Sequence, residues 1–361
     1  MACPRLIEFG LHRVMLALDR PYPVAFTTFT ALEAIVVEAM DENGAVGCGE
    51  VTIVPLYTSE TVEGGWNFCK AQLPSLLGSS IAQGKRALVP HLNSAPHAVS
   101  AVMASLEMLD GDPLLRQSTM VRVPVLAPVR NIDEAAIAAE VEELVAIGHR
   151  TLKVKVGFAT IEADLARLRF IARCAAGRAR LRVDANQGYD VATGVRFAKS
   201  LDPETVELFE QPCHMNDWEG NARVAAQSAV PVMLDESVYT LDDIRRAAEV
   251  AGVGYVKLVM EKPGGLRLTL AGLELIRACG MEPVIGNGAA SDCTSWMEAC
   301  LAGRAVVAAG EMHGFLKLRR PLLSPPLRFD HGDIILDVEY SPTIDRDSLN
   351  EQTIASERFR A

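Results

Sequence analysis

Short apolar segments alternate strictly with amphipathic segments from residue 121 to residue 309 of this 361-residue chain. Each apolar segment has the length of a buried strand, and each is followed by a longer segment with apolar residues at helical spacing. Strands joined through helices in this way pair in parallel, because each helix returns the chain to the same edge of the sheet. The pattern predicts a parallel α/β barrel of eight strands, with the last helix shortened or missing.

The predicted strands are residues 121–128, 151–156, 180–183, 206–209, 231–234, 253–259, 282–285 and 305–309. The predicted helices between them are residues 132–147, 161–175, 191–200, 218–227, 241–250, 266–279 and 292–301.

The length of the chain points to a second domain, since 361 residues exceed the usual size of one domain. Before the barrel, two strand-like and two helix-like segments predict an α+β unit: residues 6–17, 32–51, 58–77 and 95–109. We therefore expect a first domain over residues 1–120, the barrel over residues 121–317, and a segment over residues 318–361 that returns to the first domain. The polar residues 341–361 are expected to be mobile.

Charge and apolar content exclude several classes of protein. The net charge of −11 has the wrong sign for a nucleic-acid partner. With 49% hydrophobic residues the chain should be compact, yet no apolar run is long enough to span a bilayer and the N-terminus lacks a signal-like apolar core. We expect a cytoplasmic protein with no membrane partner. The eight cysteines form no CxxC pair and predict neither a zinc site nor a disulfide framework.

Two lysines, Lys153 and Lys155, lie one residue apart in the second predicted strand. Because side chains alternate along a strand, both point to the same face. An ordinary strand with one face in water would show this pattern too. A functional interpretation requires further polar residues at the ends of neighbouring strands, where the site of such a barrel lies.

Carboxylates end the next three strands, each about one β/α unit further along the chain: Asp184, Glu210 and Asp235. Any one of them could instead favour the N-terminus of the following helix. Three carboxylates at one barrel mouth would repel one another unless a cation lay among them. Oxygen ligands of this kind select a hard ion, so we expect Mg²⁺, with Mn²⁺ as the alternative.

A third lysine, Lys257, ends the sixth strand, about half a barrel away from Lys155. Next to a divalent cation and a second ammonium group, the pKa of a lysine should fall, and a neutral amine could act as a base. The site would then hold an electrophilic metal and a base on each face of a substrate. This arrangement suits abstraction of a proton α to a carboxylate through an enediolate intermediate.

Five ordered motifs resemble the muconate lactonizing enzyme subgroup of the enolase superfamily. They are Lys153-Val154-Lys155, Asp184-Ala185-Asn186, Phe209-Glu210-Gln211-Pro212, Leu234-Asp235-Glu236-Ser237, and Lys257 within Tyr255-Val256-Lys257-Leu258. The resemblance covers nearly the whole chain. It implies a (β/α)₇β modified TIM barrel with an N-terminal α+β capping domain that the C-terminal tail completes.

By position, the resemblance implies a role for each of these residues. Asp184, Glu210 and Asp235 would bind Mg²⁺, and Lys155 and Lys257 would be the acid and base. Lys153 would tune Lys155 and contact the substrate carboxylate. The remaining candidates for supporting or substrate-binding residues are Asn186, Glu236, Asn287, Glu311, His313 and Tyr57.

The sequence also departs from known subgroups. No His of a His-Asp dyad is present near the seventh strand, which disfavours the mandelate racemase subgroup. The loop there reads Gly286-Asn287-Gly288-Ala289-Ala290-Ser291-Asp292, without the Ser- and Glu-containing stretch of many relatives. Residues 310–315 lack the Asp-x-Asp pair expected of dipeptide epimerases, so dipeptides are disfavoured. Glu311 and His313 could bind an ammonium group or assist a leaving group, or be ordinary loop residues.

The overall reaction stays open, because racemisation or epimerisation, dehydration and cycloisomerisation can all use the same lysines. We favour an amino-acid-like acid, such as the proline derivative hydroxyproline, that is epimerised or dehydrated. From other classes, a non-catalytic binding homologue would have lost a ligand or a lysine, and an aldolase would form a Schiff base. Residues 21–30 are expected to be either a connector or a lid over the site. We also expect a homo-oligomer.

Overall fold

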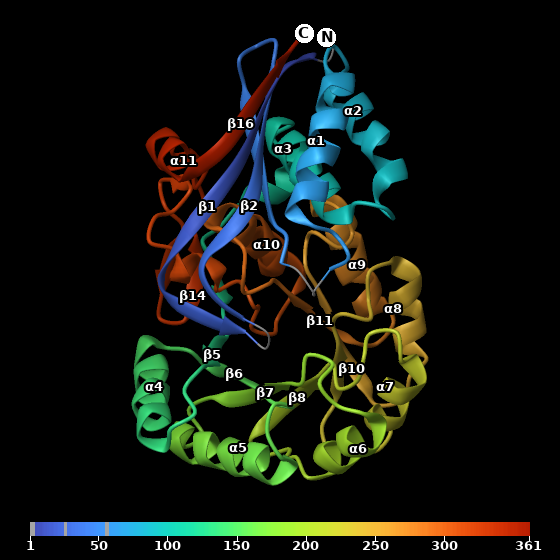
Figure 1. Cartoon of the computed structure of the whole chain (residues 1–361), viewed down its shortest axis with the longest axis vertical. Coiled ribbons are helices and arrows are strands. Elements are labelled where there is room, and N and C mark those ends of the chain that lie inside the picture. Colours follow the sequence, from blue (N-terminus) through green and yellow to red (C-terminus); the bar gives the residue numbers. More distant parts are fainter. Residues whose placement is uncertain (1–3, 25–26, 55–57) are drawn as a thin grey trace.

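The computed structural model describes residues 4–24, 27–54 and 58–361, and its centre is a curled parallel sheet (Figure 1). The spatial order of its strands follows the chain, β5-β6-β7-β8-β9-β10-β11, so each strand pairs with the one before and the one after. This is the predicted (β/α)₇β modified TIM barrel with an N-terminal cap. The strands are β5 (Ala127–Val129), β6 (Thr151–Lys155), β7 (Arg180–Asp184), β8 (Val206–Glu210), β9 (Val232–Leu234), β10 (Val253–Leu258) and β11 (Glu282–Ile285).

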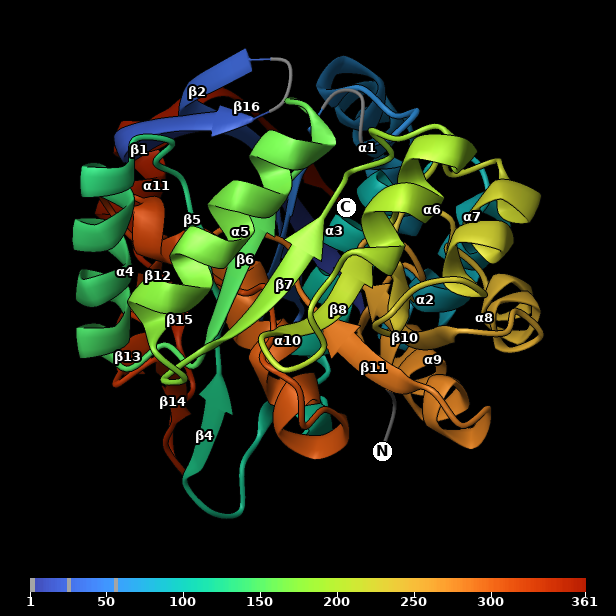
Figure 2. The same ribbon diagram turned by 90° about the horizontal axis from the view of Figure 1, so that it is seen from below.

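Helices cover the outer face of this sheet, as the view from below shows (Figure 2). Most begin at a Ser, Thr or Asp whose side chain accepts a hydrogen bond from a backbone N–H in the first turn, which explains why the sequence located them well. The helices are α4 (Glu134–Ile147), α5 (Ile161–Ala175), α6 (Val191–Lys199), α7 (Trp218–Ala225), α8 (Leu241–Ala248), α9 (Leu266–Ala278) and α10 (Asp292–Ala305).

The predicted eighth strand at residues 305–309 is wrong. Helix α10 runs on to Ala305, and the barrel is closed instead by Gly310 and Glu311. The N–H of Gly310 donates to Pro124 O at 2.9 Å, and the N–H of Glu311 donates to Ile285 O at 2.9 Å. Only one residue hydrogen-bonds to each neighbouring segment, so this part of the chain is too short to form a strand. Its hydrogen bonds nevertheless bring Glu311 to the barrel wall.

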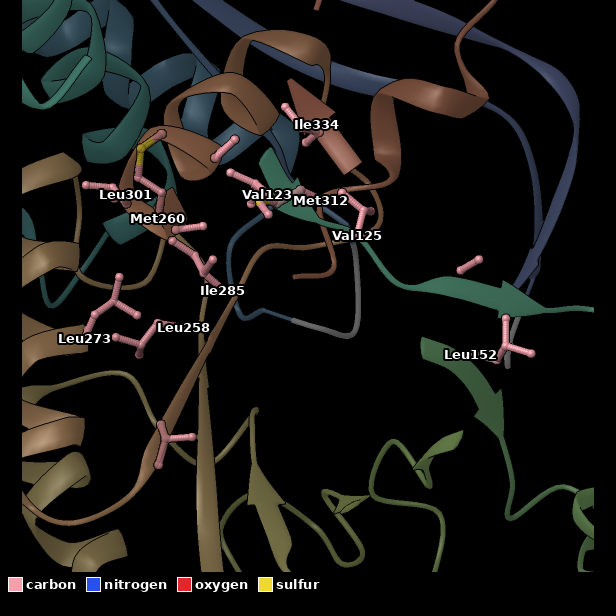
Figure 3. Close-up of a cluster of buried hydrophobic side chains, with 14 of the residues drawn as sticks. Val123, Val125, Leu152, Leu258, Met260, Leu273, Ile285, Leu301, Met312 and Ile334 are labelled. Atoms are coloured by element: carbon pink, nitrogen blue, oxygen red, sulfur yellow. The ribbon is translucent and has the colours of Figure 1, made fainter. Parts of the chain in front are cut away.

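The predicted first strand, residues 121–128, is divided in two. Its first half, β4 (Val121–Pro124), pairs antiparallel with β14 (Asp333–Leu336), and only the second half, β5, joins the parallel sheet. Both halves contribute to the main apolar core, part of which Figure 3 shows, including Val125, Ile285 and Met312. The pairing of β14 shows that the C-terminal tail first packs on the barrel before it reaches the cap.

The cap is an antiparallel sheet of order β16-β1-β2-β3 with three helices against it (Figure 1). The final strand pairs with β1 from Glu8↔Arg360 to Val14↔Thr353. Residues 341–361, expected to be mobile, are therefore ordered as β15, α11 and β16. The cap elements are β1 (Leu6–Val24), β2 (Thr27–Asp41), β3 (Val46–Thr52), α1 (Val62–Leu76), α2 (Ile81–Leu88), α3 (Pro96–Leu109) and β16 (Thr353–Arg360).

Shorter elements complete the chain. They are η1 (Val89–His91), η2 (Pro113–Leu115), η3 (Gly314–Lys317), β12 (Leu323–Ser324), β13 (Arg328–Asp330), β15 (Thr343–Ile344) and α11 (Arg346–Gln352). In the described part of the chain, no helix is long and apolar enough to cross a membrane. The domain limits at residues 120 and 317 stay predictions.

Two buried carboxylates of the cap hold it against the barrel. Glu107 of α3 accepts hydrogen bonds from the N–H groups of Leu266 and Arg267, at 2.8 and 3.2 Å, and so caps the start of α9, whose own N-cap residue is Gly265. Glu50 of β3 accepts from the Ser291 side chain at 2.7 Å, at the start of α10. The cap therefore supplies the acceptor for the first N–H groups of α9 and fixes Ser291, the N-cap residue of α10.

Strand β3 lies so close to α3 that it has no space for side chains at its glycines. A methyl group on Gly49 would overlap the carbonyl oxygen of Ala101 and lie 2.7 Å from the backbone nitrogen of Ser105. We predict that Gly49→Ala lowers the free energy of unfolding by about 1 to 3 kcal/mol, measured by denaturant unfolding, because strand and helix must separate. Gly44→Asn, at an open turn position with φ of +80°, is the control and should change stability little. Equal stability of the Gly49→Ala variant would contradict this description of the contact.

Candidate active site

The strand register places the predicted polar residues side by side at one end of the barrel. Lys155 of β6 is the Cα partner of Asp184 of β7, and Asp184 is the partner of Glu210 of β8. Glu210 pairs with Met233 of β9, so Asp235 follows two residues beyond the paired end. Parallel strands in register bring their C-terminal residues to the same edge, so the structure gathers these side chains into one site.

Two buried lysines bind the carboxylates together. Lys153 Nζ lies 2.9 Å from Asp184 Oδ2, 3.0 Å from Glu210 Oε2 and 2.8 Å from Glu311 Oε2. Lys257 Nζ lies 2.6 Å from both Glu210 Oε1 and Asp235 Oδ2, and 2.8 Å from Glu311 Oε2. Glu210 and Glu311 therefore each bridge the two ammonium groups. All six side chains are buried.

This network changes the expected ionisation of the lysines. Burial alone would lower the pKa of Lys257, but Asp235, Glu210 and Glu311 outweigh it and raise that pKa well above its usual value. The pKa of Lys153 is raised in the same way, with Asp184 as the strongest opposing charge. The sequence predicted a lowered pKa next to a metal ion. Here the lysines contact the carboxylates directly, and these negative charges stabilise the ammonium form. The pKa of each lysine is therefore raised instead of lowered.

The carboxylates show the complementary effects. Burial, reinforced by Asp184, raises the pKa of Glu210 to about 7 although two ammonium groups are in contact with it. Burial and Asp235 raise the pKa of Glu236 to about 8. Burial would also raise the pKa of Glu311, but Lys153 and Lys257 outweigh it and hold that pKa well below its usual range. The site contains more carboxylate than its lysines neutralise.

The donor set fits a hard divalent cation. Within the described residues, Asp184 Oδ2 is buried and makes no hydrogen bond of good geometry, and Glu236 Oε2 is buried without a hydrogen-bond partner. Among the described residues, however, no three His, Cys, Asp or Glu side chains stand at metal-binding spacing, because the two ammonium groups lie between the carboxylates. Asp184, Glu210 and Asp235 could hold the ion once Lys153 and Lys257 move from between them.

Lys155 belongs to a separate polar chain. Its Nζ donates to Asn186 Oδ1 at 2.6 Å, and Asn186 Nδ2 donates to Glu236 Oε1 at 3.2 Å. The backbone N–H of Asn186 donates to Asp184 Oδ1 at 2.7 Å, which holds this residue against the carboxylate cluster. Lys155 is less buried than Lys153 and lies at the wall of the cavity described next.

A cavity of about 140 Å³ lies between the barrel end and the cap. The barrel contributes its lysines and carboxylates, and the cap contributes mainly apolar or neutral side chains, among them Phe29, Leu32 and Val54. The segment at residues 21–30 is not an irregular loop in its described part, because β1 and β2 continue to Val24 and from Thr27. Phe29 nevertheless reaches the cavity, and the small volume restricts the substrate to a small molecule.

The remaining predicted residues have different outcomes. Asn287 and Glu311 line the cavity, and Asn287 Nδ2 donates to Glu261 Oε1 at 2.8 Å. His313 is buried, faces the carbonyl oxygen of Glu311 at 3.1 Å and is not part of the cavity lining. Tyr57 lies outside the described residues, so its candidacy stays a prediction.

Sequence reasoning missed Glu261 and Lys262, which both line the cavity. Lys262 Nζ lies 2.7 Å from Asp235 Oδ1, so a third lysine contacts the carboxylate cluster. The sequence signal was a pair of adjacent charged residues that follows the apolar Val259 and Met260 and precedes Pro263-Gly264-Gly265. The loop they occupy follows a barrel strand, where functional residues are expected.

Comparison with known proteins agrees with this geometry. Residues 136–339 match the model of the family described as enolase C-terminal domain-like. The chain belongs to the enolase superfamily. It is of the mandelate racemase and muconate lactonizing enzyme type, as the five motifs predicted, and it is an isomerase or lyase of that superfamily.

The relatives have related but different activities. An aromatic dipeptide epimerase of Herpetosiphon aurantiacus is 30% identical over 289 residues, covering 76% of this chain and 80% of that protein. Muconate cycloisomerase 1 of Acinetobacter baylyi is 24% identical over 340 residues, covering 88% and 90%. The crystal structure of N-succinyl Arg/Lys racemase from Bacillus cereus has a TM-score of 0.90 at 21% identity and covers 99% of this chain and 100% of that one. Enolase superfamily enzymes generally use a divalent metal ion, usually Mg²⁺.

We predict that the Mg²⁺ affinity of the purified protein increases with pH. The pKa of Glu210 is about 7, so in the metal-free protein a proton must leave before the ion binds near neutral pH. Affinity should rise by up to about tenfold per pH unit between about pH 6 and pH 7 and level off above about pH 8. Titration calorimetry in two buffers of different protonation enthalpy should show proton release.

Glu210→Gln is the matched variant, since its amide has no proton to lose. It should bind Mg²⁺ weakly and with less proton release. Affinity that is independent of pH in the unsubstituted protein would contradict the assigned ionisation.

Proposed function

We propose that this enzyme abstracts the proton α to the carboxylate of a small amino-acid-like acid, with Mg²⁺ bound by Asp184, Glu210 and Asp235, and that it racemises or epimerises that carbon. The observation that carries the proposal is the position of Lys155 and Lys257. They belong to β6 and β10, which have three strands between them in the sheet, yet both line one small cavity with the carboxylate cluster between them. Two separated amines around one substrate suit removal of a proton on one face and return on the other.

Each residue has a physical role in this reaction. Bound Mg²⁺ would stabilise the negative charge that develops on the substrate carboxylate as the α-proton leaves. With the charge of the carboxylates compensated, the cause of the raised pKa of Lys257 is removed, and this lysine is available for proton transfer. Lys153 lies at the cavity wall and can hold the substrate carboxylate. Phe29 and Leu32 of the cap exclude water from the reacting atoms.

Dehydration of a hydroxy acid such as a hydroxyproline is the second candidate, and Glu236 favours it. This carboxyl group lines the cavity, and burial, the largest cause of its raised pKa, favours its protonated form. After the α-proton is removed, the bond between the β-carbon and the hydroxyl group would break, and the leaving group would take a proton from the acid and depart as water. Asn186 links Glu236 to Lys155 through two hydrogen bonds and so fixes the orientation of both groups towards the cavity.

Cycloisomerisation is the third reaction that the family allows. Dipeptide substrates remain disfavoured, because residues 310–315 lack the Asp-x-Asp pair. The homo-oligomer and the cytoplasmic location stay predictions.

We predict that the enzyme exchanges the α-proton of its substrate with solvent. In D₂O with Mg²⁺, nuclear magnetic resonance should show deuterium at the α-position, and Lys155→Met and Lys257→Met should each reduce exchange for one enantiomer by at least about 100-fold. Removal of metal with a chelator should abolish exchange, and Mg²⁺ should restore it.

Lys199→Met, at an exposed position of α6, is the matched control and should exchange normally. Unchanged activity after metal removal, or normal exchange of both enantiomers in both lysine variants, would refute the proposal.

A further inference from the structure

The cavity contains a carboxylate that the proposed proton transfer does not use. Glu261 follows β10 by three residues and lines the cavity, although only 1% of the residue is exposed. Its Oε1 accepts a hydrogen bond from Asn287 Nδ2 at 2.8 Å. Its Oε2 is buried and has no hydrogen-bond partner in the described part of the chain. A buried carboxylate oxygen without a partner is costly unless a ligand supplies one.

The surroundings of Glu261 are acidic. Glu298 of α10 is fully buried, its Oε1 accepts from the N–H of Met260 at 3.0 Å, and its Oε2 lacks a partner within the described residues. Burial raises the pKa of Glu298, and Glu261 and Glu50 raise it further. Burial likewise raises the pKa of Glu261, with His97 as the strongest opposing group.

Nearby basic side chains have other partners. His97 Nδ1 is 2.8 Å from Glu60 Oε1, and Lys262 Nζ is 2.7 Å from Asp235 Oδ1. Neither of these contacts satisfies Glu261 Oε2. This part of the cavity therefore has acidic groups in excess of cations, and a cationic ligand would correct the imbalance.

We propose that Glu261 binds the protonated amino nitrogen of the substrate, so that the enzyme acts on free α-amino or α-imino acids whose nitrogen carries a positive charge. The inference rests on the proposed function and specifies its substrate class. A cavity of about 140 Å³ is small enough for one zwitterion to reach Lys153 with its carboxylate and Glu261 with its ammonium group. A charge-assisted hydrogen bond from that ammonium would satisfy Oε2.

The same contact excludes other ligands. Acylation removes the positive charge from the α-nitrogen of an amino acid, and an N-succinyl group or a dicarboxylate would bring a second negative charge into the cavity with Glu261 and Glu298. The names of the relatives, N-succinyl Arg/Lys racemase and muconate cycloisomerase, refer to such anionic molecules. We therefore infer that this enzyme prefers substrates with a positively charged α-nitrogen, unlike the molecules for which these two relatives are named. This preference disfavours the cycloisomerase alternative.

The test measures α-proton exchange in D₂O with Mg²⁺ for a panel of matched pairs. Proline, 3-hydroxyproline, 4-hydroxyproline and alanine are each compared with their N-acetyl and N-succinyl forms, and cis,cis-muconate is included. We expect exchange for at least one free amino or imino acid and at least tenfold slower exchange for its acylated forms. Exchange of acylated forms alone would overturn the inference and leave the proposed function intact. No exchange for any compound would overturn both.

Variants then test the residue itself on the best compound of the panel. Glu261→Gln keeps the size of the side chain and its contact with Asn287 but removes the charge. The Glu261→Gln variant should have a KM for the free acid that is at least tenfold higher, with a smaller change in kcat. Its preference for the free acid over the N-acetyl form should be smaller than that of the unsubstituted enzyme. Glu261→Asp should restore part of the affinity.

Glu274→Gln is the matched control, because it removes the same charge from an exposed position of α9 that does not line the cavity. It should leave KM within about twofold. Thermal unfolding of each variant separates loss of folding from loss of binding. A folded Glu261→Gln enzyme with unchanged KM and unchanged preference, or an equal effect of Glu274→Gln, would overturn the inference.

Discussion

The charge balance between two buried lysines and four carboxylates is the interaction on which the site depends. Lys153 and Lys257 contact Asp184, Glu210, Asp235 and Glu311 at 2.6 to 3.0 Å, and none of these side chains could be buried alone. Loss of one partner from such a network typically costs about 3 to 5 kcal/mol. The members lie in or directly after different segments of the barrel, so the network depends on the register of the strands from β6 to β10. The same balance leaves the site short of positive charge, which a divalent ion and a cationic substrate can supply.

The barrel and the cap contribute different kinds of side chain to the cavity. The barrel supplies lysines and carboxylates, whereas the cap supplies mainly apolar or neutral side chains that limit the size of the cavity. Glu50 and Glu107 fix the two parts to each other through the first turns of α10 and α9. The geometry of the cavity is consequently set by contacts that lie away from it.

Patterns within single segments made most of the fold predictable. Strand and helix periods located the barrel elements, often to the residue, and charged residues at strand ends located the carboxylate cluster. Features that depend on distant partners were not predictable in the same way. Residues 305–309 look like a strand, but whether they pair depends on Ile285 and Pro124. The residues of β16 are polar and therefore suggested a mobile tail. They are ordered because they pair with β1, which a single segment does not reveal. The pKa direction of Lys257 depends on how many carboxylates reach it, and a single segment does not reveal that number.

The contact between Glu107 and α9 has a consequence for recombining these proteins. Gly265, at the N-cap of α9, has no side chain to cap the helix, and Met103 and Glu107 of α3 occupy the space beside it. A chimera that joins this barrel to the cap of a relative would leave the first N–H groups of α9 without an acceptor unless the new cap carries a carboxylate at the same place. Exchange of whole caps should therefore fail more often than exchange of individual residues around the cavity, and natural divergence of substrate choice in this fold would be expected to proceed by the second route.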